Sequence, residues 1–370
     1  MKRELLLVKI LIITTMVCTY IIPISMLDDF FPNVSKIIFI SIMSFIYFIK
    51  LNKVSIKEVL LLLLIFALFY YTRNINYLLF ISILLLPKML NDDNLLFIKQ
   101  YLKNSKLLYI CLLFTFFYSA IYFGLDGRYA HTGLTAPNQS GLAIFCLSMM
   151  ILKKNRRLGI ISLLFGCLTL SRSYFLAIII YLLSKINLFK KISIKRIKQL
   201  NYLKLTIYST IALLFLAFLF IYQYDQGNII NNTYSSNRLI NIFDYSNFYR
   251  FTAVLIIISI FKNNPKAMLF GISEDYYVKY GLEISSKMKI PYHNTVPHNL
   301  FLAHLKLYGL YSIIEVIYTS IILKKIIDNS NFYLYIIIFL YSIILGAGLY
   351  SYWLYLSVLM FIMYRNENKQ

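Results

Sequence analysis

Residues 5–27, LLLVKILIITTMVCTYIIPISML, contain one charged side chain, Lys9, in 23 positions. A helix that crosses a lipid bilayer needs about 20 consecutive apolar residues, so this run is long enough to span. The apolar core of a secretory signal peptide is shorter, about 7–15 residues, and precedes a small-x-small cleavage site, which this stretch lacks. We therefore expect residues 5–27 to be a retained first membrane span.

Apolar runs near span length recur as far as Tyr364, and 60% of the 370 residues are hydrophobic, with a mean hydropathy of +0.70. A soluble domain of this size has too little interior to hide so much apolar surface. The sequence predicts an all-α, polytopic integral membrane protein: a single membrane domain over residues 1–370 with about twelve transmembrane helices. The expected spans are residues 5–27, 34–51, 55–71, 75–90, 106–123, 138–152, 157–171, 173–188, 204–222, 300–323, 332–346 and 349–364.

The distribution of lysine and arginine predicts the orientation. With the N-terminus inside, the inner segments hold 24 basic residues and the short outer loops hold only Arg73, Arg128 and Arg172. Because cytoplasmic loops are enriched in positive charge, we expect both termini in the cytoplasm and the protein in the plasma (inner) membrane. The net charge of +22 sits in short clusters between apolar runs. That distribution indicates the lipid bilayer, and not a nucleic acid, as partner.

Residues 223–299 break the pattern of short loops. The stretch is 77 residues long, polar and mixed in charge, and the predicted orientation places it outside as one large extracytoplasmic loop between spans nine and ten. Its apolar run 251–261 is too short to span, so we expect an amphipathic or half-buried helix there. Loops this long in a compact protein are usually functional.

The cysteines lie singly inside apolar runs and form no CxxC pair; they are Cys18, Cys111, Cys146 and Cys167. This placement indicates packing residues and argues against a disulfide framework or a zinc site. We expect neither a metal nor another cofactor.

Two polar segments on the predicted outer side hold candidate functional residues. Residues 127–141, GRYAHTGLTAPNQSG, place Arg128 and His131 between glycines, and a helix is expected from the proline with Asn138 at the membrane surface. Residues 170–173, LSRS, put Arg172 at a tight outer turn. Since this arginine opposes the positive-inside bias, we infer that it is retained for a purpose.

The large loop supplies a further arginine. Arg250 is followed by Asn264, Pro265 and Gly271, and Arg238 is the alternative candidate in the same loop.

A histidine stands directly before the next span. Residues 296–299, VPHN, place His298 and Asn299 just before the helix expected from Leu300.

Other polar residues have simpler interpretations. Arg73 is as readily a lipid-headgroup anchor as a functional residue, and Arg128 shares that ambiguity. His293 is interpreted as a solvated loop residue, and His304 and Lys306 are expected to reach the headgroups from the start of their span.

Arginine and histidine together suit one kind of chemistry. The guanidinium group binds phosphate oxygens in a bidentate manner and keeps its charge. A histidine, with an unperturbed pKa of about 6.5, accepts a proton from a sugar hydroxyl near neutral pH. Arginines that hold a leaving diphosphate, with a histidine base, make a glycosyl-transfer site that needs no metal.

At these residues the sequence resembles the bacterial O-antigen polymerase and O-antigen ligase-like membrane protein family, which assembles surface polysaccharides. Four pieces carry the resemblance in order across residues 127–310: GLTAPNQSG at 133–141, LSRS at 170–173, Arg250 with Asn264-Pro265 and Gly271, and His298-Asn299 ahead of Gly309. The twelve-span layout with one large late outer loop is also similar. Val254 replaces the tryptophan that often follows the family's loop arginine by four residues.

The resemblance implies a polymerase that moves a growing glycan from undecaprenyl diphosphate onto a new lipid-linked repeat unit. Arg172 and Arg250 would hold the diphosphate, and His298 would activate or position the acceptor hydroxyl. The residues expected to help bind substrate are Arg128, His131, Asn138, Arg238 and Asn299. The implied partners are an undecaprenyl-diphosphate-linked oligosaccharide and a chain-length regulator protein.

Three alternatives stay open. An O-antigen ligase would use the same donor with a different acceptor. A metal-dependent sugar transferase would place paired acids in the first outer loop, where Asp28 and Asp29 stand in a loop of six residues. A lipid-linked-oligosaccharide flippase, which is not an enzyme, would carry charges deep in its spans, where Glu315 is the clear acid.

Overall fold

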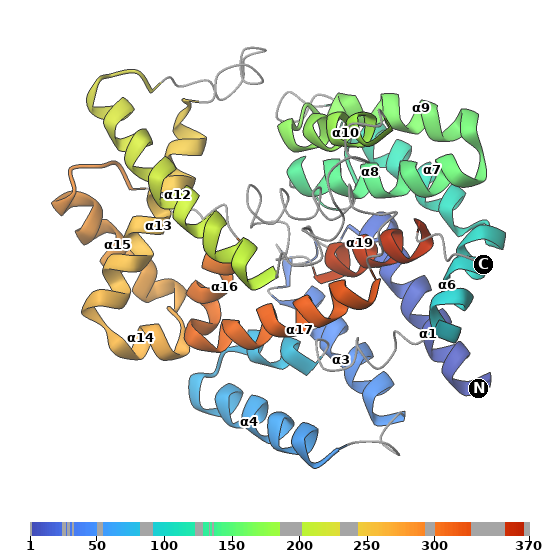
Figure 1. Ribbon diagram of the computed structural model, residues 1–370, viewed down its shortest axis with the longest axis horizontal. Helices are drawn as coiled ribbons and strands as arrows, with labels where there is room; N and C mark the ends of the chain where they lie inside the picture. Colours follow the sequence, from blue (N-terminus) through green and yellow to red (C-terminus); the bar gives the residue numbers. More distant parts are fainter. Residues whose placement is uncertain are drawn as a thin grey trace. The chain divides into compact units, whose positions relative to one another are not determined.

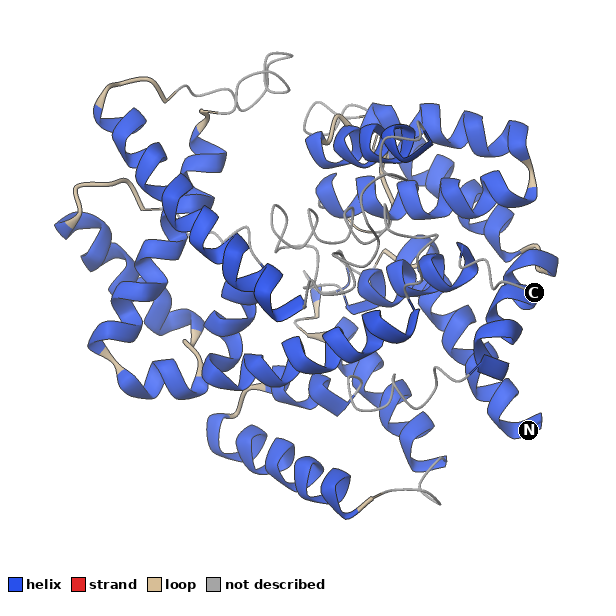
Figure 2. Ribbon diagram, viewed as in Figure 1, coloured by secondary structure: helices blue, strands red, loops and turns tan. Residues whose placement is uncertain are grey.

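The computed structural model describes residues 2–23, 27, 30–31, 33–49, 55–81, 92–122, 129–132, 134, 137–185, 202–229, 243–292, 300–326 and 352–365. Over these ranges the regular structure is helical and contains no β-strand (Figures 1 and 2), which confirms the all-α prediction. The chain divides into two compact units. Unit 1 comprises Met1–Ile194, Tyr318–Ile337 and Leu349–Gln370, and unit 2 comprises Lys195–Ile317 and Ile338–Gly348.

Unit 1 is built around one helix that is buried on all sides. The described helices of this unit are α1 (Lys2–Met16), η1 (Val17–Ile21), α3 (Val34–Ile49), α4 (Ile56–Thr72), η3 (Ile75–Leu79), α6 (Asp92–Asn104), α7 (Leu107–Ile121), α8 (Pro137–Lys154), α9 (Arg156–Gly166), η5 (Cys167–Thr169), α10 (Arg172–Lys185) and α19 (Tyr352–Arg365). Residues 142–151 of α8 are all buried, as expected for a helix that is apolar around its whole circumference. Helices α7, α9, α10 and α19 contact α8.

The two ends of the chain meet in this core. The Tyr20 hydroxyl donates a hydrogen bond to the Ala143 carbonyl oxygen at 2.9 Å and lies 3.0 Å from Ser357 Oγ. The Trp353 ring meets Phe39 edge to face at 4.9 Å. These contacts join η1 and α3, from the first part of the chain, to α8 and α19 in one packed body.

Unit 2 contains the stretch expected to be a large loop, and the described part of it is helical. The described helices are α12 (Tyr202–Asp225), α13 (Tyr245–Asn263), α14 (Pro265–Phe270), α15 (Glu274–Lys287), α16 (Leu300–Tyr308), η8 (Gly309–Tyr311) and the first turns of α17 (Ser312–Ile326). The helix expected over 251–261 is present as the longer α13. Stacked rings pack α12 on α13, with Phe220 against Phe251 and Tyr224 against Phe248, each pair at 4.8 Å.

The structure supports fewer membrane spans than the sequence predicted, as judged by the length and composition of the described helices. Among the described residues, Glu4–Ile21 is long and apolar enough to cross a bilayer. Two bent pairs, Asp93–Asn104 with Leu107–Ile121 and Leu302–Ile314 with Val316–Ile322, raise the number to three if each pair is one span. The twelve-span layout stays a prediction.

Several predicted boundaries differ from the observed helices. Residues 92–104, expected in an inner loop, form α6, whose buried face holds Asn94, Ile98 and Leu102. The span expected over 300–323 is interrupted by η8. The span expected from residue 75 begins with the 3-10 helix η3, and the one expected over 332–346 lies outside the described residues.

Candidate functional site

Arg172 is the first residue of α10 and follows a tight turn. Leu170 ends η5 in the left-handed conformation, with φ of 48° and ψ of 30°, and Ser171 is buried. The N–H groups in the first turn of a helix lack intrahelical partners and favour an anion. Arg172 thus stands at a helix end suited to negative charge; the structure describes its backbone but not its side chain.

The turn at residues 170–173 packs closely against the end of the motif at residues 133–141. A Cβ atom at Gly166 would overlap the ring of Tyr174, whose hydroxyl donates to the Leu163 carbonyl oxygen at 2.6 Å. A Cβ atom at Gly141 would lie 3.2 Å from Cβ of Ser171. The end of the GLTAPNQSG motif and the LSRS motif therefore pack against each other inside unit 1.

His131 lies in the interior, although the sequence placed it in an outer loop. Only 4% of the residue is exposed, and its ring meets Tyr122 edge to face at 5.9 Å. The backbone N–H of His131 donates to Ser119 Oγ at 2.9 Å. Asn138 falls in the first turn of α8 with its side chain outside the description, and Arg128 lies outside the described residues.

Arg250 belongs to α13 in unit 2 and is partly buried. Asp244 caps this helix, accepting a hydrogen bond from the backbone N–H of Asn247 at 2.8 Å. Beside Arg250, burial first and then the neighbouring phenols of Tyr245 and Tyr224 raise the pKa of Tyr249.

Arg238, His298 and Asn299 lie outside the described residues. Arg172 and Arg250 belong to separate units, and each is described within its own unit.

The residues that follow Arg250 in the motif have backbone roles. Asn264 caps α14, accepting a hydrogen bond from the Ala267 N–H at 3.2 Å, and Pro265 occupies the first helical position, where its missing N–H does no harm. Gly271 has φ of +87° and Gly309 has φ of +57°, values that side chains disfavour. These motif positions therefore determine how α13, α14 and α16 connect.

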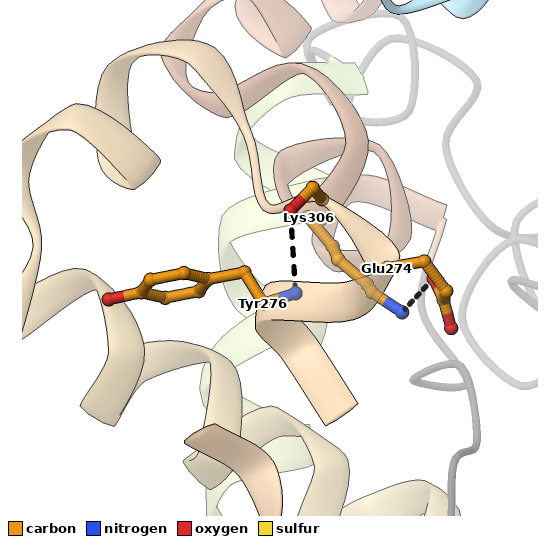
Figure 3. Close-up of polar contacts among 4 residues, drawn as sticks. Glu274, Tyr276 and Lys306 are labelled. Atoms are coloured by element: carbon orange, nitrogen blue, oxygen red, sulfur yellow. Dashed lines mark hydrogen bonds and ion pairs between the residues drawn. The ribbon is translucent and has the colours of Figure 1, made fainter. Parts of the chain in front are cut away.

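Lys306 is another residue, after His131, that sequence reasoning placed wrongly. It was expected to reach the headgroups, yet only 2% of its side chain is exposed. Its Nζ lies 3.1 Å from Oε2 of Glu274 (Figure 3). The same Nζ lies 3.6 Å from the centre of the Tyr277 ring. His304, two residues earlier in α16, is also buried. A lysine inside an apolar run is the only sequence signal of this cluster.

Within the described part of the chain, no group of three or more His, Cys, Asp or Glu residues is arranged to hold a metal ion. Asp28 and Asp29 lie outside that part.

Comparisons with protein-family models, curated proteins and solved structures give no match to this chain.

Proposed function

We propose that this chain is a membrane-embedded glycosyltransferase, a surface-polysaccharide polymerase that transfers a growing glycan from undecaprenyl diphosphate to a new lipid-linked repeat unit. The observation that carries the proposal is the Arg172 turn. An arginine opens a helix of 14 residues on the side of the membrane where the sequence predicts few positive charges. Among the described residues, one helix is long and apolar enough to span, or three if each bent pair is one span, which is compatible with a membrane enzyme. The plasma membrane and the cytoplasmic termini are part of the proposal and rest on the distribution of basic residues in the sequence.

In the proposed reaction, all the protein side chains that act on the donor and the acceptor come from this chain. The acceptor hydroxyl oxygen attacks the anomeric carbon of the donor sugar, and the bond from that carbon to the diphosphate oxygen breaks. The electron pair leaves with undecaprenyl diphosphate, where Arg172 and Arg250 offset the negative charge. His298 takes the proton of the acceptor hydroxyl. We propose no metal and no cofactor for this step.

The decisive variant is Arg172→Lys, because lysine keeps the charge but lacks the planar fork that binds two phosphate oxygens. In purified protein supplied with a lipid-diphosphate repeat unit, we expect Arg172→Lys to abolish the ladder of polymers that wild type makes. Arg73→Lys is the matched control. Arg73 is another arginine at a predicted outer turn, but its guanidinium stacks on Tyr70 of its own helix, with Cζ 4.5 Å from the ring centre. This control should leave the ladder unchanged.

The acceptor separates the polymerase from the ligase. A ladder of repeat units supports the polymerase, whereas a single transfer to a different acceptor supports the ligase alternative. A full ladder from Arg172→Lys removes Arg172 from the mechanism. If wild type forms no glycosidic bond with either acceptor, the proposed function is wrong and the flippase alternative gains.

A further inference from the structure

In unit 1, a lysine joins the corner between α6 and α7 to the corner between α8 and α9. The Lys154 Nζ donates a hydrogen bond to the Ser105 carbonyl oxygen at 2.5 Å and lies 4.8 Å from the centre of the Tyr109 ring. Ser105 lies between α6 and α7, and Lys154 is the last residue of α8. Both corners therefore lie at the same end of unit 1.

Four exposed cations surround this contact. Two flank the α6–α7 corner and two begin α9; these four residues, here named the basic corner, are Lys103, Lys106, Arg156 and Arg157. The stretches 103–109 and 152–158 contain no aspartate or glutamate that would neutralise them. The two arginines also occupy the first turn of α9, where the helix dipole disfavours positive charge. The stability of α9 therefore does not account for the charge of the basic corner.

Exposed apolar side chains begin one turn beyond the basic corner. They lie on α7 and α9 and are Ile110, Leu113, Phe117, Ile160, Ile161 and Leu164. The two helices meet where the Phe116 ring contacts Phe165 edge to face at 4.6 Å. Each phenylalanine is nine residues after the first residue of its own helix. Helices α7 and α9, which both contact α8 (Figure 1), therefore run in the same direction away from the basic corner.

Tyrosine rings mark the same end of unit 1. Three lysines there lie over tyrosine rings: Lys9 over Tyr101 at 5.7 Å, Lys153 over Tyr364 at 5.5 Å and Lys154 over Tyr109 at 4.8 Å. Tyrosine is enriched where a membrane meets water, and lysine stems lie along apolar surface there with the ammonium group in the polar layer. The basic corner thus has the surroundings of a membrane–water interface.

The length of the apolar surface matches one leaflet. Helix α9 has 11 residues and is about 16 Å long at about 1.5 Å per residue. Half of a hydrocarbon core of about 30 Å is about 15 Å. A cluster of positive charge, followed by one leaflet of exposed apolar side chains, complements both the headgroup and the acyl chains of an anionic phospholipid.

We propose that the basic corner and the exposed apolar faces of α7 and α9 bind an anionic phospholipid of the cytoplasmic leaflet. Arg156 and Arg157 bind the phosphate, because a guanidinium group pairs with two phosphate oxygens, and the two lysines add positive charge. The acyl chains lie along α7 and α9. This site is on the predicted inner side, whereas Arg172 follows the opposite end of α9, so the inference does not depend on the proposed transfer reaction.

The test is native mass spectrometry of the purified full-length protein in detergent, titrated with phosphatidylglycerol. We expect this lipid to bind wild type about 10-fold or more tightly than phosphatidylcholine with the same acyl chains, because basic sites at the cytoplasmic face select anionic headgroups. Arg156→Gln/Arg157→Gln should weaken binding of phosphatidylglycerol about 10- to 30-fold, since each cation near the membrane surface contributes about 5-fold. Lys103→Gln/Lys106→Gln should weaken it in the same direction. All four positions are exposed, so glutamine is compatible with folding.

Lys279→Gln/Lys287→Gln is the matched control. It removes the same amount of charge from two exposed positions of α15 in unit 2, on the predicted outer side. Because charges more than about 10 Å apart are largely screened at about 0.1 M salt, binding of phosphatidylglycerol should stay within about 2-fold of wild type. A second control adds glycerol 3-phosphate, which carries the phosphate without acyl chains and should not displace the lipid.

Selective binding of phosphatidylglycerol that is lost in the arginine variant and kept in the α15 variant supports the inference. Equal binding of the two lipids by wild type overturns it, as does wild-type affinity in Arg156→Gln/Arg157→Gln. An equal loss in the α15 variant shows that net charge alone acts, which also overturns the site. Displacement by glycerol 3-phosphate overturns the lipid assignment, because the apolar faces would then contribute nothing. None of these outcomes bears on whether the protein transfers a glycan.

Discussion

Substituting Gly309 tests the close backbone contact between η8 and α14, and the quantity measured is the free energy of unfolding. The residue has φ of +57°, and placing alanine in the left-handed region costs about 1–2 kcal/mol. The added Cβ would also overlap the carbonyl oxygens of Met268 and Leu269. Because these are backbone atoms, no rotamer change relieves the overlap, and overpacking of this kind adds about 1–3 kcal/mol. We expect Gly309→Ala to destabilise the protein by about 2–5 kcal/mol in total.

Gly227→Ala separates the two contributions. Gly227 also has a positive φ, of +73°, but no atom lies within 4 Å of a Cβ built there. This control should lose only the conformational part, about 1–2 kcal/mol. The assay is SDS-induced unfolding of the purified protein in detergent micelles, followed by helical circular dichroism. Equal losses in the two variants would refute the reasoning, because they would show that the close backbone contact contributes nothing.

Two further predictions address topology and capping. Reporter fusions after Leu188 should give a cytoplasmic signal, and fusions near Asn232 should give an external one. The reason is that 24 basic residues stand on the predicted inner side and three in the short outer loops. A cytoplasmic signal near Asn232 would put the proposed site on the wrong face of the membrane. Asn264→Ala should cost about 1 kcal/mol in the same unfolding assay, because it removes the cap of α14. Asn228→Ala, at an exposed hydrogen bond to Gln223, should cost less, and the reverse order would contradict the capping role.

Apolar content predicted much of the helical structure. The run that opens the chain becomes α1 and η1, and the run over 138–152 becomes the buried helix α8. Helix α6 was not predicted because its two aspartates and two lysines hide a buried face that repeats every four residues, through Asn94, Ile98 and Leu102. The four-residue spacing of this face is present in the sequence, but a search for long apolar runs does not detect it.

The Lys306 cluster shows why the candidate site was harder to predict than the helices. Its partner Glu274 is 32 residues away along the chain, in the predicted large extracytoplasmic loop. Local sequence determines that Lys306 lies in a helix. Only the packing of α16 on α15 determines that its ammonium group is buried against a carboxylate and an aromatic ring. Pairings between distant helices leave no periodic signal in one sequence.

The motif residues divide into two kinds, and this division affects what the family resemblance can support. Gly141, Asn264, Gly271 and Gly309 have backbone roles: close packing, a helix cap and two positive φ values. Residues with backbone roles bear on how helices connect and carry no information about the acceptor. The proposed chemistry rests on the arginines and on His298, which are the residues that bear charge or accept a proton. A polymerase and a ligase built on the same connections would therefore differ in the residues around the acceptor, and acceptor preference has to be measured as a property separate from diphosphate binding.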